Sequence, residues 1–156
     1  FGGLATMTAT HNNLPAINGL VIADVGMKFV LTDQWMLPVF FGAGVRLLSP
    51  TNGEASTDWG THLGAGIQRH FRIWRRISPF VGGSLDFGFV DPSGPGNFTF
   101  TLGLGPLLGI EYYWGDRASL AAYYEFKLRL AHTDGAGTAV EFSTLAGGSL
   151  MQTFYF

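Results

Sequence analysis

The feature that most constrains the fold is a two-residue alternation of apolar and polar side chains, repeated along most of the chain. Between residues 21 and 31, and again between 35 and 47, each odd position is apolar; between 120 and 130 each even position is apolar. A period of two is typical of a β-strand whose two faces meet different surroundings. The charged residues of these stretches all lie on the second face: Asp24, Lys28, Arg46, Glu125, Lys127 and Arg129.

Composition limits the class of protein that such strands can build. Apolar residues make up 47% of the 156 residues and charged residues only 13%, against about 25% charged residues in a typical soluble domain. The net charge of −2 offers no basic surface for nucleic acid, and without cysteine there is neither a disulfide framework nor thiolate chemistry. No uninterrupted apolar run reaches the roughly 18 residues of a membrane helix. The chain is therefore either a glycine-rich soluble β protein or a protein that crosses a membrane as strands.

Turn-forming residues divide the chain into segments with strand character. Polar loops alternate with mostly tight turns, which is the pattern of an up-and-down outer-membrane barrel. We find no helix of useful length and no linker, so residues 1–156 are expected to form a single domain. The eight expected strands are residues 1–10, 20–31, 35–48, 59–70, 77–89, 98–113, 118–131 and 138–156.

Three observations indicate which face lies inside. The interior of an eight-stranded barrel has little room for large side chains, yet Trp, Phe, Leu, Val and Ile fill one face. The other face is rich in glycine, which leaves gaps for long polar side chains in a narrow lumen. Aromatic residues collect near both strand ends, as in the interfacial girdles of membrane barrels. We therefore expect an all-β fold, an eight-stranded antiparallel up-and-down transmembrane β-barrel with a polar, charge-paired interior.

Prolines and outward glycines predict local irregularities in this barrel. Pro38 and Pro106 lie inside expected strands, and each removes a hydrogen bond from the ladder, so we expect a bulge or a weakened pair there. Gly3, Gly83 and Gly148 fall on the outward face, where they give flat spots for a lipid or another barrel.

The inward face brings charges of both signs into a narrow space. Five of these charges are negative and four are positive, which favours a plug of salt bridges, because a conducting pore favours a ring of one sign. The predicted lumen charge network consists of Asp24, Lys28, Arg46, Asp86, Glu111, Glu125, Lys127, Arg129 and Glu141.

Hairpin geometry predicts which inward residues face each other. A last hairpin centred near residue 135 places Arg129 opposite Glu141, and the loop before the fourth strand places Arg46 opposite His62. His62 and His70 both point inward, but a spacing of eight along a strand is too long for one metal ion. We assign no metal and no cofactor.

The whole pattern resembles the small eight-stranded outer-membrane proteins of the OmpA-like, OmpX-like and OmpW-like kind. A terminal Phe156, with Phe154 and Leu150 at alternate upstream positions, resembles the signal read by the barrel-assembly machinery, although Gln152 departs from the usual apolar choice. The resemblance implies a Gram-negative outer membrane, contact with membrane lipid and lipopolysaccharide, and biogenesis by that machinery. The start at Phe1 in place of Met indicates a processed N-terminus, and we take a signal peptide to have been removed.

Residues 109–137 also resemble lipid A 3-O-deacylases, outer-membrane barrels that hydrolyse an acyl chain from lipopolysaccharide. In that family a strand ends in His-x-Ser-Asn-Ala-Gly, with the His as base, the Ser as nucleophile and an acid downstream. His132, Ala136 and Gly137 match this pattern, whereas Asp134 stands at the nucleophile position. The match is therefore partial.

The resemblance offers His132, Asp134 and Glu141 as catalytic candidates. Asp134 cannot replace a base-activated hydroxyl in that mechanism, and strand alternation turns both Thr133 and Glu141 away from His132. An enzymatic role is thus the less favoured interpretation.

We expect a small outer-membrane barrel with a structural or scaffold role, as a membrane anchor or a subunit of an envelope assembly. One alternative is a deacylase-like barrel made inactive by Asp134. A second alternative is a narrow channel for small solutes. We also expect other envelope proteins as partners, and we expect no nucleic acid among them.

Overall fold

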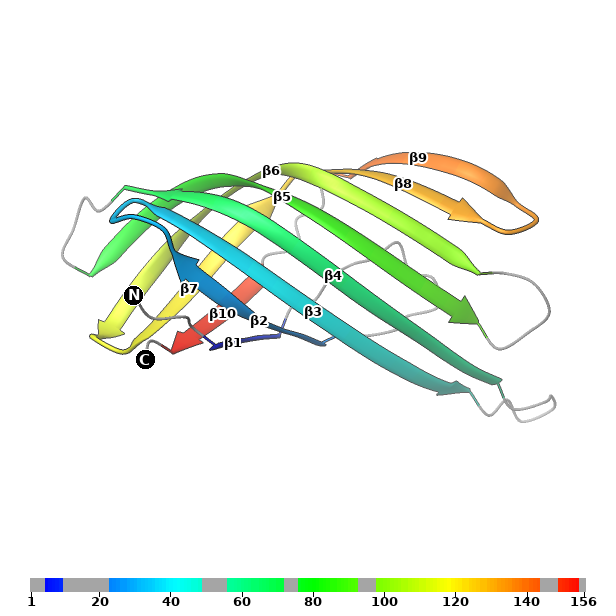
Figure 1. The fold of residues 1–156 in the computed structure, drawn as a ribbon, viewed down its shortest axis with the longest axis horizontal. Helices are drawn as coiled ribbons and strands as arrows, with labels where there is room; N and C mark the ends of the chain where they lie inside the picture. The colour runs from blue at the N-terminus through cyan, green and yellow to red at the C-terminus, as the bar shows by residue number, and fades with distance from the viewer. Residues whose placement is uncertain are drawn as a thin grey trace.

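The computed structural model describes residues 5–9, 23–48, 56–71, 76–92, 98–143 and 149–154, and strands make up most of these ranges (Figure 1). No helix among the described residues is long and apolar enough to cross a membrane. The strands are β1 Ala5–Ala9, β2 Ala23–Val30, β3 Trp35–Leu48, β4 Ser56–His70, β5 Ile77–Pro92, β6 Thr99–Gly115, β7 Ala118–Glu125, β8 Lys127–Thr133, β9 Gly137–Ser143 and β10 Ser149–Phe154.

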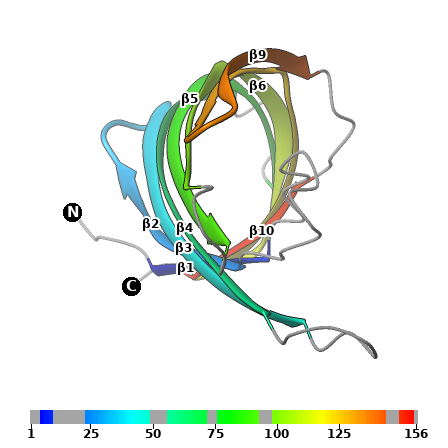
Figure 2. The ribbon, with the colours of Figure 1, turned by 90° about the vertical axis from the view of Figure 1, so that its right-hand side faces the viewer.

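Antiparallel pairing closes eight of these strands into a ring in the order β1, β2, β3, β4, β5, β6, β7 and β10, and β10 pairs with β1. Figure 2 looks along this ring from one end. β8 pairs with β6 in the same register as β7 does, so β7 and β8 together form the predicted seventh strand. The predicted fold class is therefore confirmed. We call the end where β2 joins β3 the turn end, and the opposite end, where β8 joins β9, the rim.

The two prolines that the sequence predicts inside strands, Pro38 and Pro106, each interrupt a ladder. The β3–β4 ladder lacks its pairs at Leu37 and Pro38. On the other side of the barrel, the seventh strand is broken at Phe126, whose N–H donates to the Pro106 carbonyl at 3.0 Å. Proline has no N–H to return to its partner, so the ladder cannot be completed at either position.

Of the strand boundaries that differ from the prediction, the start of β4 changes a predicted pair. β4 begins at Ser56 and not at residue 59, so the hairpin between β3 and β4 is centred two residues earlier than expected. In the observed register Arg46 faces Asp58, and His62 faces Gly42. The predicted Arg46–His62 pair is therefore wrong, because register follows from the centre of the connection.

The two faces of the sheet have the polarity expected of a membrane barrel. Outward positions carry exposed apolar side chains, with Val45 at 68% and Phe142 at 70% exposure. Inward positions hold buried polar groups, and Lys28 and Glu111 are both 0% exposed. This is the reverse of a soluble protein, in which apolar side chains fill the interior and most charged side chains are exposed. An outward apolar face of this kind is suited to hydrocarbon.

Candidate functional site

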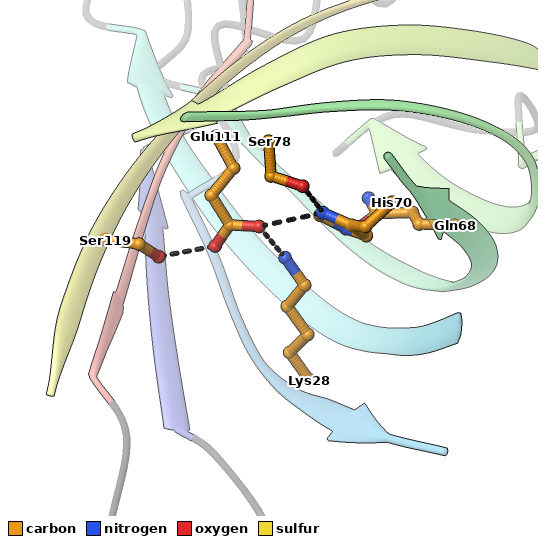
Figure 3. A network of polar contacts seen from close by, with 6 residues as sticks. All are labelled: Lys28, Gln68, His70, Ser78, Glu111 and Ser119. Carbon is orange, nitrogen blue, oxygen red and sulfur yellow. Dashed lines mark hydrogen bonds and ion pairs between the residues drawn. The ribbon is translucent and has the colours of Figure 1, made fainter. Parts of the chain in front are cut away.

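A buried polar network crosses the lumen near the turn end of the barrel (Figure 3). Lys28 on β2 donates from Nζ to Glu111 Oε2 on β6 at 2.6 Å, and both side chains are fully buried. β2 and β6 are not neighbours in the ring, so this ion pair spans the interior. The members of this turn-end network are Lys28, Gln68, His70, Ser78, Glu111 and Ser119.

Further side chains of this network surround the carboxylate of Glu111. Ser119 donates to Oε1 at 2.5 Å, and His70 Nδ1 lies 3.6 Å from Oε2. The His70 ring is itself held on two sides, with Ser78 Oγ 3.1 Å from Nδ1 and Gln68 Oε1 3.3 Å from Nε2. A buried ion pair is tolerated when such additional hydrogen bonds satisfy its remaining atoms.

Apolar side chains pack against the turn-end network inside the barrel. Phe80 stacks on the His70 ring with centroids 4.9 Å apart, and Lys28 Nζ lies 5.9 Å from the Phe80 centroid. The buried apolar residues that pack with Phe80 are Leu107, Ala121 and Met151. Side chains from strands on different sides of the ring therefore meet at this level of the lumen.

A second group of charges, the mid-lumen network, lies closer to the rim. Lys127 Nζ on β8 is 2.7 Å from Asp86 Oδ2 on β5 and 3.2 Å from Glu125 Oε2. His62 Nε2 lies 3.5 Å from the other oxygen of Asp86, and Ser84 donates to Glu125. β6 lies between β5 and β8 in the sheet, so the Lys127–Asp86 pair also joins two strands that are not neighbours.

The structure brings together part of the predicted lumen charge network. The members found in the two networks are Lys28, Glu111, Asp86, Glu125 and Lys127. Arg129 faces Glu141 in the β8–β9 register, as predicted. Arg129 is buried, and its Nε has no hydrogen-bond partner in the part of the chain that the structure describes. The side chains of Asp24 and Arg46 lie outside the described part.

Sequence reasoning missed the neutral members of the turn-end network. Gln68, Ser78 and Ser119 are each buried, and each occupies an inward position by the alternation that identified the charges. The two-residue alternation therefore predicts these residues inside the lumen, although they carry no charge.

At the rim, His132 lies on the outward face with polar neighbours of its own. His132 Nδ1 is 2.9 Å from the Thr138 hydroxyl on β9, and His132 Nε2 is 3.9 Å from Asp134 Oδ1. The side chains of His132 and Asp134 are 55% and 64% exposed. A hydroxyl, an imidazole and a carboxylate in this order can act as nucleophile, base and orienting acid.

The catalytic candidates from the sequence separate into two faces. Asp134 lies beside His132, whereas Glu141 is half-buried on the lumen side. Thr133 is also turned away, and its hydroxyl lies 3.0 Å from that of Thr99. Thr138 was missed, although the hairpin register that pairs Arg129 with Glu141 also places it opposite His132.

Comparison with known proteins identifies the fold. No family model and no curated protein matches the chain. Among solved structures, Neisserial surface protein A (NspA) is similar with a TM-score of 0.53 and 15% identity, over 99% of this chain and 93% of that one. The outer-membrane protein Ail of Yersinia pestis in a phospholipid nanodisc is similar with a TM-score of 0.49 and 12% identity, over 99% of both chains. The likeness to NspA shows that the fold is that of a small outer-membrane β-barrel.

Proposed function

We propose that this chain is a structural barrel of the bacterial outer membrane whose lumen is closed by side chains. It serves as a membrane anchor or as a subunit of an envelope assembly. The observation that carries the proposal is the Lys28–Glu111 pair, which joins opposite parts of the ring at 2.6 Å with both side chains fully buried. A conducting pore favours a wet lumen lined by charges of one sign.

The outward surface supports the proposed location. Exposed apolar side chains are suited to membrane lipid and the acyl chains of lipopolysaccharide. Short connections are periplasmic in outer-membrane barrels, which assigns the turn end to the periplasm. Phe154 ends β10 with its side chain 43% exposed, in keeping with a signal for the barrel-assembly machinery, and Phe156 lies outside the described residues.

The closed lumen predicts that the protein carries no stable ion current. Purified protein in planar bilayers is expected to give a flat trace, because one ion pair crosses the interior and a second ion pair lies within the lumen. A variant with alanine at Lys28, Glu111, Lys127 and Asp86 removes both ion pairs and is the matched control, in which conductance is expected to appear. Stable unitary currents from the wild-type protein would rule out the closed barrel.

A second candidate function is ester hydrolysis at the rim, favoured by the Thr138–His132–Asp134 arrangement. Thr138 Oγ1 attacks the carbonyl carbon of a lipid ester while its proton passes to His132 Nδ1. Collapse of the tetrahedral species breaks the bond to the lipid alcohol, which takes that proton. Water then attacks the acyl-threonine with the same base and releases the fatty acid. Asp134 here orients the base and is not the nucleophile.

Mass spectrometry of lipid A from cells that express the protein tests this second candidate. The wild-type barrel is expected to remove one acyl chain, and Thr138→Val or His132→Ala to lower the yield by at least ~10²-fold, since each removes one partner of the nucleophile–base pair. Glu141→Gln is the control that leaves the yield unchanged, because Glu141 is on the lumen side. An unchanged lipid A mass on expression of the wild-type protein would dismiss hydrolysis of lipid A.

A further inference from the structure

The outward face near the turn end carries one arginine between two aromatic rings. Arg69 on β4 is exposed, and its guanidinium carbon lies 5.8 Å from the Trp35 ring and 5.4 Å from the Phe71 ring. Trp35 is its direct partner across the β3–β4 ladder. Within the described residues no carboxylate lies within ion-pair distance of Arg69. The two aromatic contacts therefore orient a cation that is available to an external anion.

An apolar hollow begins next to this arginine and extends along the outward surface of β3 to β6. These four strands run side by side (Figure 1). Its volume is about 580 Å³, within the range of roughly 300–1,000 Å³ found for ligand pockets. Gly83 contributes no side chain to its floor, and Pro106, whose carbonyl accepts from Phe126 at the break in the seventh strand, also lines it. Outward-facing residues that line the hollow include Leu37, Ala65, Ile67, Gly83, Leu104 and Pro106.

The arginine and the hollow lie at a spacing that suits one lipid molecule. Ile67 precedes Arg69 by two residues on the same face of β4, which corresponds to roughly 6.6–6.8 Å along a strand. A cation at the membrane interface with an apolar groove running from it toward the membrane interior matches a phosphate group with an acyl chain attached. Arginine binds phosphate through its planar fork of donors.

We propose that Arg69 and the hollow around Gly83 bind one glycerophospholipid, with the phosphate on Arg69 and an acyl chain in the hollow. The site rests on the membrane location of the proposed function, and the turn end assigns it to the periplasmic leaflet. A second copy of the chain is a less suitable occupant of this site. The exposed carboxylates described at the turn end, Asp33 and Asp116, lie in the turns beyond the strand ends and not on the outward strand face that carries Arg69. The carboxylates on the outward strand face and beside it, Asp91 and Asp134, lie near the rim.

Native mass spectrometry of the full-length protein, released from bilayers of phosphatidylethanolamine and phosphatidylglycerol, tests the proposal. The wild-type barrel is expected to retain one phospholipid, and Arg69→Gln to lower that retention by about 10-fold or more, equivalent to the loss of one charge-assisted contact. Arg76→Gln, which changes an exposed arginine in the turn at the same end, is the matched control and retains the lipid.

The other end of the site is tested by filling the hollow. A Cβ at Gly83 meets only the Gly105 carbonyl oxygen, at 3.6 Å, so Gly83→Leu fits the backbone and displaces the acyl chain. Val81→Leu is its control, because Val81 is outward on the same strand but does not line the hollow. Gly83→Ala gives a smaller loss in the same direction.

The variants and two further measurements distinguish the possible occupants of the site. Equal retention by all variants overturns the site. Binding of inorganic phosphate by the wild-type barrel, with no phospholipid retained, shows that Arg69 takes a free anion, and a dimer lost in Gly83→Leu shows a second copy; either result overturns the lipid proposal. A heat-induced shift in gel migration, checked for each variant, shows whether the barrel itself has formed. If the wild-type protein lacks this shift, the proposed function fails; if every variant keeps it while retention is unaffected, only the lipid site fails.

Discussion

Replacing Lys28 by methionine is expected to lower the free energy of unfolding of the barrel by about 3–5 kcal/mol, because it leaves a buried charge without its partner. Methionine keeps the length of the apolar stem but removes the ammonium group that lies 2.6 Å from Glu111 Oε2. The carboxylate stays fully buried, and Ser119 and His70 still lie close to it. Neither neighbour carries the permanent charge that Lys28 supplied.

Urea titration of the barrel in lipid vesicles, followed by tryptophan fluorescence and by gel migration without boiling, measures this loss. The double variant Lys28→Met with Glu111→Gln removes both charges and is expected to recover most of the lost stability. Replacing a buried ion pair by uncharged residues often changes the free energy of unfolding little. Arg76→Gln, a turn charge at the same end, should stay within about 0.5 kcal/mol of wild type. A loss below about 1 kcal/mol for Lys28→Met would show that this pair does not close the lumen.

The fold was predictable because the strand period is a local property. Each side chain alternates with its neighbours whatever the distant parts of the chain do, so the inward placement of Lys28, Glu111 and Asp86 followed from parity alone. Register is local only where the connection is short. The tight turn around Gly135 led to the correct Arg129–Glu141 register, whereas the longer connection before β4 did not, and Arg46 faces Asp58.

The contacts inside the lumen could not be predicted from local sequence, because they depend on how the barrel closes. Lys28 and Glu111 are 83 residues apart and meet across the interior. Their meeting depends on the stagger of strands around the ring, which is a property of the whole barrel. The hollow beside Arg69 has the same origin. Leu37 on β3 and Pro106 on β6 both line it, and only the assembled sheet brings them to one surface.

Replacing Gly109 by valine is expected to cost about 2–3 kcal/mol of unfolding free energy, because it overfills the lumen. A Cβ at this position would lie 2.6 Å from three atoms at once: the Ala122 carbonyl oxygen, Phe80 Cζ and Tyr123 Cβ.

Valine is otherwise favoured in strands, so Gly83→Val is the matched control. A Cβ at Gly83 has its nearest contact at 3.6 Å, and the control is expected to lose no stability. The same urea titration in vesicles measures both variants. Equal stabilities would mean that the interior beside Phe80 is loosely filled, and the closed lumen would then rest on the ion pairs alone.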